Sequence, residues 1–406
     1  MSEFAFKLRQ IVQRMWFLPA AFSLLAVLML VIAFGTARLI PDELPFTLPS
    51  NAVETILTVL ASSLLTVAVF ALSTIVSALA SASSSTSPRA VPLIVGDRSA
   101  QTSISVFIGA FLFAIVAIIG LSAGIYSDAG RLVLFAATLG VVVLVVAALI
   151  RWIGQISAIG RVAQTIERAE EAAAGAFRDA PGQGLLGCRR QEERAEGEPV
   201  FCKEIGYVQH INVSRLQSLA EEHDLQLAIT ARPGAYAAPD RPLLVVTGGT
   251  LADEVAEKLG NAFVTGRARS FDNDPRFGLI VLAEIAGKAL SPGINDPGTA
   301  IAVIGAMVRV LAERPMEEDE VRFDRVTMPA LDPDDLMADA FRPIARDGAG
   351  SIEVMLRLTA GLKTLVRYRP DLESSARGMI GDALERGLSK LDAESDKLAL
   401  KAAAEI

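Results

Sequence analysis

Residues 53–82 read VETILTVLASSLLTVAVFALSTIVSALASA. A helix of about 20 apolar residues crosses a bilayer, because each residue rises about 1.5 Å and the hydrocarbon core is about 30 Å thick. The run is long enough, and hydroxyl side chains recur in it at helical spacing. At about 100° per residue they fall within about 60° of one another. The sequence therefore predicts a membrane helix with one largely polar face, made of Thr55, Ser62, Thr66, Val69, Ser73, Ser77 and Ser84.

This face allows two interpretations. Small hydroxyl residues let membrane helices approach closely and hydrogen-bond across their interface. Alternatively, the face lines a water-filled pore that narrows near Val69 and Phe70 and closes there by dewetting. No charged side chain lies deep in a predicted span, which argues against a proton relay or an ion-coupled pump.

Three further stretches, 16–37, 104–125 and 132–153, are also apolar and long enough to cross a bilayer. We therefore expect a transmembrane domain of four helices over residues 1–154. The first stretch follows a basic segment, as the core of a signal peptide does, but it exceeds the roughly 7 to 15 apolar residues of such a core. We expect this helix to be retained.

Basic residues flank the predicted spans unequally, and the side richer in lysine and arginine faces the cytoplasm in membrane proteins. This rule predicts a multi-pass protein of the bacterial inner membrane with both termini in the cytoplasm and the lipid bilayer as a partner. One side carries Lys7, Arg9, Arg14, Arg89, Arg98, Arg151, Arg161 and Arg168, and the other carries Arg38 and Arg131.

The composition excludes several classes of function. The formal net charge of −8 leaves no basic face for nucleic acid. The chain has only two cysteines, so a disulfide framework is not expected. We predict no metal site and no cofactor, because the spacings of the zinc-type residues lack the short paired steps of structural zinc sites. These residues are Cys188, Cys202, His210 and His223.

The second half reads as a cytoplasmic α+β domain. We expect a helical connector at 155–180, a flexible loop at 181–199, a small β domain at 200–250 and a mainly helical domain at 251–406. Strands predicted at 205–211, 225–231 and 243–247 surround a helix at 213–223. With the Pro233-Gly234 turn, this order is similar to the barrel-sandwich of biotinyl and lipoyl carrier domains, although the carrier lysine is absent. Thr250 is the expected N-cap of a helix at 251–259.

The segment 291–297 reads SPGINDP and joins two predicted helices. As a structural elbow, Pro292 ends the first helix, Gly293 supplies a positive φ, and Asp296 and Pro297 begin the second. The alternative is a ligand site built from the oxygens of Ser291, Asn295 and Asp296. One helix earlier, Glu284 and Lys288 are spaced for a surface salt bridge.

Two motifs carry a family resemblance. The four-span start, the Asp-Pro-x-Phe-Gly step at 274–278 and Ala-Leu-Ser-Pro-Gly-Ile-Asn-Asp-Pro at 289–297 resemble the bacterial membrane-protein family called domain of unknown function 2254. The likeness covers nearly the whole chain. It implies the architecture described above and brings no activity with it.

The remaining sequence offers amphipathic helices at 352–368 and 372–391, and acidic clusters at 317–320 and 332–335 that we interpret as solvated connectors. No hydrolase, zinc-protease or kinase motif occurs, so an enzyme ranks last. The sequence favours a channel or transport protein for a small ion or solute, because of the hydroxyl face of the second span. We expect it to be oligomeric, because four helices of one chain are few to enclose a water column. The alternative is a membrane-anchored sensor or scaffold whose cytoplasmic domain binds a small molecule or a protein.

Overall fold

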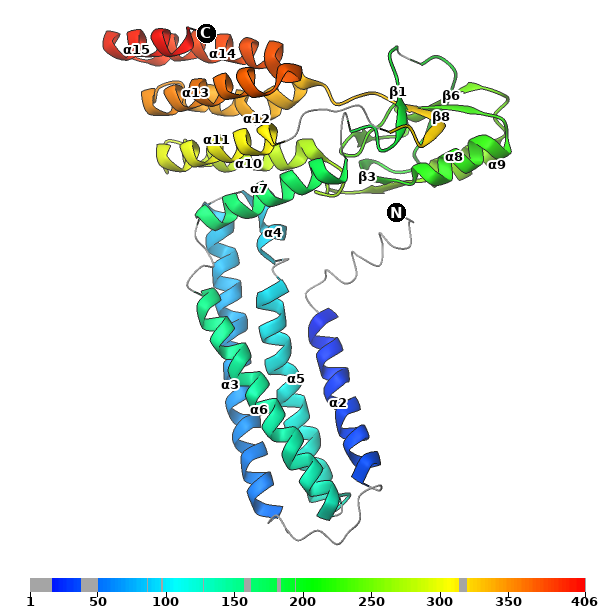
Figure 1. Ribbon diagram of the computed structural model, residues 1–406, viewed down its shortest axis with the longest axis vertical. Coiled ribbons are helices and arrows are strands. Elements are labelled where there is room, and N and C mark those ends of the chain that lie inside the picture. The colour runs from blue at the N-terminus through cyan, green and yellow to red at the C-terminus, as the bar shows by residue number, and fades with distance from the viewer. Residues whose placement is uncertain are drawn as a thin grey trace. The chain divides into compact units, whose positions relative to one another are not determined.

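A computed structural model describes residues 17–37, 50–85, 87–95, 98–126, 128–156, 162–180, 184–193, 195–313 and 320–405. These residues form two compact units, which are shown in Figure 1 and are described separately below. One unit contains residues 6–83 and 91–161. The other, here called the C-terminal unit, contains Ser84–Ala90 and Val162–Ile406.

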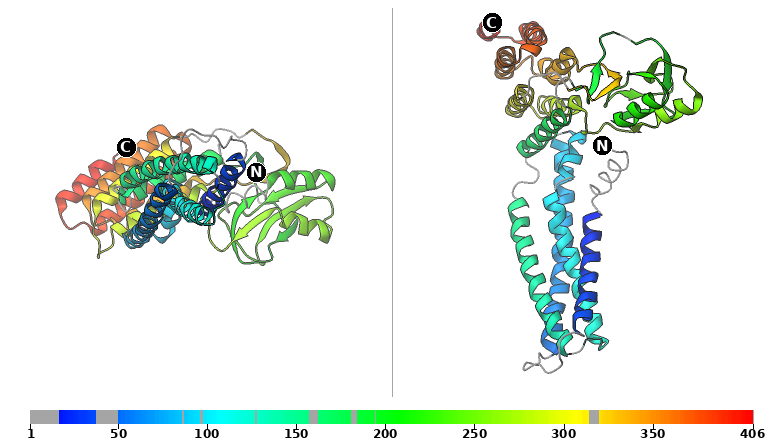
Figure 2. Two further views of the ribbon diagram at one scale, coloured as in Figure 1. Left: turned by 90° about the horizontal axis from the view of Figure 1, so that it is seen from below. Right: turned by 45° about the vertical axis from the view of Figure 1, so that its right-hand side comes forward.

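The first unit is helical, and its long helices run side by side in all the views of Figures 1 and 2. Large apolar side chains such as Leu57, Phe107 and Trp152 fill the space between them. The helices are α2 (Phe17–Ala37), α3 (Ser50–Ser85), the short α4 (Val91–Val95), α5 (Arg98–Ser122) and α6 (Asp128–Ile156).

Within the described residues, three stretches are long and apolar enough to cross a membrane: Ala52–Ser77, Gln101–Ser122 and Gly130–Gly154. They lie in α3, α5 and α6 and match the second, third and fourth predicted spans. The apolar part of α2, Phe17–Ile32, is shorter than these three. The structure therefore supports three spans, and a membrane crossing by α2, the first predicted span, stays a prediction.

Helix α7 (Val162–Asp179) supplies most of the described part of the helical connector predicted at 155–180; residues 157–161 lie outside the described residues. The apolar residues of this helix recur at helical spacing and predict one stripe. Of these, Ile166, Ala169 and Ala173 are buried, Val162 is half-buried and Ala163 is exposed. The opposite face is polar, so α7 is an amphipathic helix that belongs to the C-terminal unit.

The C-terminal unit contains two sheets. The larger has the strand order β1-β8-β4-β6-β2, with β8 parallel to both of its neighbours, and the smaller has the order β5-β3-β7. Leu216, Leu227, Leu244 and Val326 are fully buried in their shared core. The strands are β1 (Cys188–Arg190), β2 (Glu198–Phe201), β3 (Gly206–Ile211), β4 (Gln226–Ile229), β5 (Tyr236–Ala237), β6 (Pro242–Gly248), β7 (Phe263–Gly266) and β8 (Phe323–Met328).

The strands inside 200–250 lie close to their predicted positions, but the β unit is wider than that range. Strand β1 comes from the segment 181–199, which we expected to be a loop, and β8 comes from beyond residue 320. Two separate sheets take the place of the expected barrel-sandwich likeness. The pairing of β8 with β4 joins residues about 100 positions apart, so no local signal could place β8 in the larger sheet.

The helical layer of the C-terminal unit is stacked beside the sheets (Figure 1). Its central helix, α10, buries side chains on almost every side, among them Phe277, Leu282 and Ile285. Helices α8 (Val213–Glu222) and α9 (Asp253–Gly260) cover the sheets. The layer contains α10 (Pro275–Ala289), α11 (Pro297–Ala312), α12 (Pro333–Asp347), α13 (Ile352–Tyr368), α14 (Glu373–Lys390) and α15 (Glu394–Ala404).

Two local predictions fare differently. Helix α13 has the predicted bounds, 352–368. The predicted N-cap of α9 is wrong, because the cap is Ala252 and its side chain makes no capping hydrogen bond. Asp253 and Glu254 instead place negative charge in the first turn, where the helix dipole favours it.

Candidate functional site

The predicted polar face of α3 points away from the core of its own unit. Six of its seven members are exposed: Thr55, Ser62, Thr66, Val69, Ser73 and Ser77. The side chain of Ser84 lies outside the described residues. The buried residues of α3 fall on the other side of the helix, about 180° away at about 100° per residue. They are Val53, Leu57, Ala61, Leu64, Ala71 and Ile75.

Two hydroxyls of this face bond to the backbone of their own helix. Ser62 Oγ donates to the carbonyl oxygen of Thr58 at 2.9 Å, and Thr66 Oγ1 donates to that of Ser62 at 3.3 Å. Such bonds satisfy a hydroxyl without a second helix. Two large apolar residues, Val69 and Phe70, interrupt the hydroxyl row and are 61% and 63% exposed. Close packing inside a single chain therefore does not explain the face.

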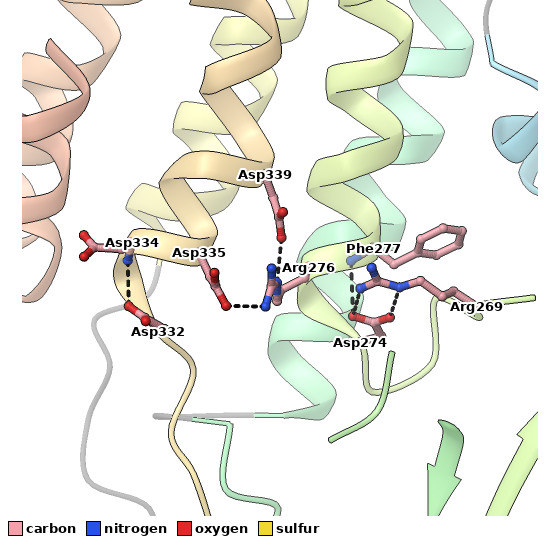
Figure 3. Close-up of polar contacts among 8 residues, drawn as sticks. All are labelled: Arg269, Asp274, Arg276, Phe277, Asp332, Asp334, Asp335 and Asp339. Atoms are coloured by element: carbon pink, nitrogen blue, oxygen red, sulfur yellow. Dashed lines mark hydrogen bonds and ion pairs between the residues drawn. The ribbon is translucent and has the colours of Figure 1, made fainter. Parts of the chain in front are cut away.

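In the C-terminal unit, the first family motif surrounds a buried ion pair (Figure 3). The guanidinium of Arg269 binds both carboxylate oxygens of Asp274 at 2.8 Å, and the Phe277 N–H donates to the same group at 3.2 Å. Asp274 is only 2% exposed. Burial raises the pKa of its carboxyl above the ordinary value, while the bonds from Arg269 and Phe277 act to lower that pKa. Removing one partner of such a buried pair strongly destabilises the fold, because the other charge is left buried without compensation.

The neighbouring Arg276 ties α10 to α12. It donates to Asp339 at 2.6 Å and also pairs with Asp335 (Figure 3). Asp332 caps α12 by accepting the Asp334 N–H at 2.9 Å. The acidic cluster at 332–335 is therefore partly structural, which corrects its interpretation as a solvated connector. Of the cluster at 317–320, residues 317–319 lie outside the described residues.

The SPGINDP segment forms the predicted elbow, with one change. Asp296 caps α11 by accepting the Thr299 N–H at 3.1 Å and the Thr299 hydroxyl at 2.6 Å. Ser291 Oγ donates to the Lys288 carbonyl at 2.6 Å. The residue with positive φ is Asn295, at 49°, and not Gly293. Each candidate ligand residue thus has a place in the turn, and the ligand site at Ser291, Asn295 and Asp296 stays a hypothesis.

The two family motifs begin their helices with the same kind of turn. Asn273-Asp274-Pro275 repeats the arrangement of Asn295-Asp296-Pro297, since Asn273 also has a positive φ, 55°, and Asp274 caps α10. Asparagine tolerates the left-handed region better than most residues, aspartate accepts the free N–H groups, and proline suits the first helical position. The repeated Asn-Asp-Pro triplet was a signal for this geometry in the sequence.

A cavity of about 370 Å³ opens beside β3 and the start of α8. His210, which is buried, lies in its wall, and His210 Nδ1 is 3.4 Å from the side-chain nitrogen of Asn273. Ser214 and Arg322 also line it. Cys188 and Cys202 lie in the sheet core. Across the described parts of the chain, no three histidine, cysteine or acidic side chains gather as a metal site would require.

The sequence pattern of the family described as "Predicted membrane protein (DUF2254)" matches residues 12–364. The chain belongs to this family. Uncharacterised proteins of Mycobacterium bovis and of a Mycobacterium tuberculosis strain are each 30% identical to it over 147 residues, which is 32% of this chain and 26% of theirs. The chain thus spans about a quarter of the length of the curated relatives that it matches. No solved structure matches the chain.

Sequence reasoning missed two features of this DUF2254 protein. The meeting of His210 with Asn273 depends on the pairing of distant segments, and only the Asn-Asp-Pro triplet gave a partial signal for it. The second feature is a contact between Ser87, Arg89 and Glu284, which joins residues almost 200 positions apart.

Proposed function

We propose that this DUF2254 protein is a subunit of an oligomeric channel or transport protein of the bacterial inner membrane. Four helices cross the bilayer, both termini lie in the cytoplasm, and α3 lines the pore with Thr55, Ser62, Thr66, Val69, Ser73, Ser77 and Ser84. One observation carries the proposal: the exposed hydroxyl face of α3 lies opposite the face that packs against its own chain.

A face of this kind suits a weakly selective pore. Hydroxyls that already bond to their own backbone can face water or a neighbouring helix without an unsatisfied group. Several copies are needed to surround a water column, because the polar face is turned outward from a single chain. The exposed Val69 and Phe70 then form an apolar constriction that gates by dewetting.

Cysteine accessibility tests this proposal. Ser62→Cys and its neighbour Ser63→Cys place the same thiol at nearly the same depth, but about 100° apart around the helix. Both parent side chains are exposed in the single chain. With the protein in its native membrane, we expect a membrane-impermeant thiol reagent to modify Ser62→Cys and to leave Ser63→Cys unmodified. Protein carrying only Cys188 and Cys202 gives the background reaction.

Flux is the second readout. Protein reconstituted in liposomes should conduct small ions or solutes, and modification of Ser62→Cys should reduce that flux. Equal reaction of the two cysteines, or no flux at any voltage, membrane tension or pH, would overturn the proposal.

The alternative is a membrane-anchored sensor whose C-terminal unit binds a small molecule, and the cavity beside His210 favours it. Native mass spectrometry of protein released from its own membrane tests this function. A bound small molecule that is present in the parent and lost in Ser214→Trp, which fills the cavity, would support a sensor. Bare protein in both samples would count against it.

A further inference from the structure

The segment Ser84–Ala90, between α3 and α5, belongs to the C-terminal unit, although the helices on either side of it belong to the other unit. Ser87 is 3% exposed and Ala90 is fully buried. A short 3₁₀ helix, Pro88–Ala90, follows Ser87. Ser87 and Ala90 are therefore packed within the C-terminal unit, whereas Pro88 and Arg89 between them are exposed.

One carboxylate holds the segment. Ser87 Oγ donates to Glu284 Oε2 at 2.6 Å, and the Arg89 guanidinium pairs with Glu284 Oε1. The Arg89 N–H also donates to Ser87 Oγ at 3.1 Å, which fixes the hydroxyl that reaches Glu284. We call these three residues the clasp. The sequence suggested a surface pair of Glu284 with Lys288. In the structure, one Glu284 carboxylate oxygen contacts Ser87 and the other contacts Arg89.

The clasp is anchored on the most enclosed helix of the unit. Glu284 lies on α10, and its neighbours Ala283 and Ile285 are buried. Close-packed side chains around α10 oppose any independent motion of this helix. A displacement of α10 therefore carries Glu284 with it.

The connection from the clasp to α3 is short. Helix α3 ends at Ser85, two residues before Ser87. Two residues span at most about 7 Å, so little slack separates the clasp from the last turn of α3. We propose that the clasp is the link through which the C-terminal unit sets the position of the end of α3 and the start of α5. This inference rests on the proposed function in one respect, since the motion that the clasp regulates is the opening of the proposed pore.

Hydrogen exchange of the full-length protein tests the link without a transport assay. Glu284→Ala removes the carboxylate, and Arg89→Ala removes one partner without altering α10. Because Glu284→Ala removes the acceptor of both contacts, we expect amides of residues 84–95 to exchange about tenfold faster in this variant. The rest of the C-terminal unit should exchange as in the parent. Glu254→Ala, which removes an exposed pair with Lys258, is the matched control.

A charge reversal completes the test. Arg89→Glu combined with Glu284→Arg should restore slow exchange to a large part, since the pair is rebuilt with its signs exchanged. Unchanged exchange at 84–95 in both single variants, or faster exchange confined to α10, would overturn the link. Absence of flux in the parent protein would overturn the proposed function instead, so the two failures can be told apart.

Discussion

Gly278 shows how one residue sets the spacing of two helices. A Cβ atom at this position would lie 2.5 Å from the Cβ and 2.6 Å from the Cα of Ala173 on α7. Contacts this short do not occur between real atoms, and a backbone atom cannot rotate away as a long side chain can. The glycine that ends the first family motif is thus required for the close approach of α7 and α10.

We predict that Gly278→Ala lowers the free energy of unfolding by about 1–3 kcal/mol, the usual effect of overpacking. Gly381→Ala is the control, because this glycine lies inside α14 with open space around its Cβ position. That variant should be stabilised by up to about 1 kcal/mol, since alanine favours the helix. Unfolding of both variants in detergent, followed by circular dichroism, checks the pair. Equal effects of the two substitutions would contradict the packing argument.

At this scale, the sequence predicted roles best where one residue acts on its immediate neighbours. The Asp296 cap follows from the residue types at 296–299 and is confirmed. The positive φ was assigned to Gly293 because glycine is the usual residue there, but Asn295 adopts it. Contacts between distant residues, such as Ser87 with Glu284, have no local signal, and they could not be predicted.

Two helices of the C-terminal unit, α10 and α11, begin at Asn-Asp-Pro turns, and the cap of α11 makes a prediction about pH. Hydrogen bonds from the side chain and then the backbone of Thr299 hold the pKa of Asp296 below its ordinary value. A carboxyl whose pKa is lowered by folding stabilises the fold above its ordinary pKa, near 3.8. That contribution is lost as pH falls through the lowered value.

We predict that Asp296→Ala lowers the free energy of unfolding by about 1 kcal/mol at neutral pH, the usual effect of losing an N-cap. Asp296→Asn should retain most of the cap, because asparagine also accepts the N–H. The advantage of the parent over Asp296→Asn should begin to shrink as pH falls toward 3.8, where the unfolded chain takes up a proton, and should be lost once pH passes below the lowered pKa of the folded protein. Denaturant unfolding across this range measures it. A constant difference at every pH would contradict the role of the charge.

Helices were more predictable than sheets, for a physical reason. The bounds of α13 and the buried stripe of α7 follow from a repeat of about 3.6 residues, which is visible in any short window. Strand β8 lies beyond α11 in the chain and pairs in parallel with β1 and β4, so its place in the sheet depends on long crossovers. A range of 200–250 for the β domain could not include it.

At the scale of the whole molecule, the exposed face of α3 requires something to cover it. Copies of this chain arranged around a symmetry axis would turn identical residues toward one another, because cyclic symmetry repeats the same surface at each subunit. The face is then covered by other copies or by the water between them. Self-association is therefore part of the proposed function and can be measured without flux.

We predict that Ser77→Cys forms disulfide-linked dimers when native membranes are treated with a mild oxidant. Thr74→Cys, three residues from Ser77 and about 60° from it around the helix, should form far fewer, because it lies off the polar face. Cys188 and Cys202 are buried, so the parent protein sets a low background in the same denaturing gel. A ladder shared equally by both variants would show random collision. A monomeric mass in mild detergent, together with no dimer from Ser77→Cys, would mean that lipid covers α3 and that the pore does not form.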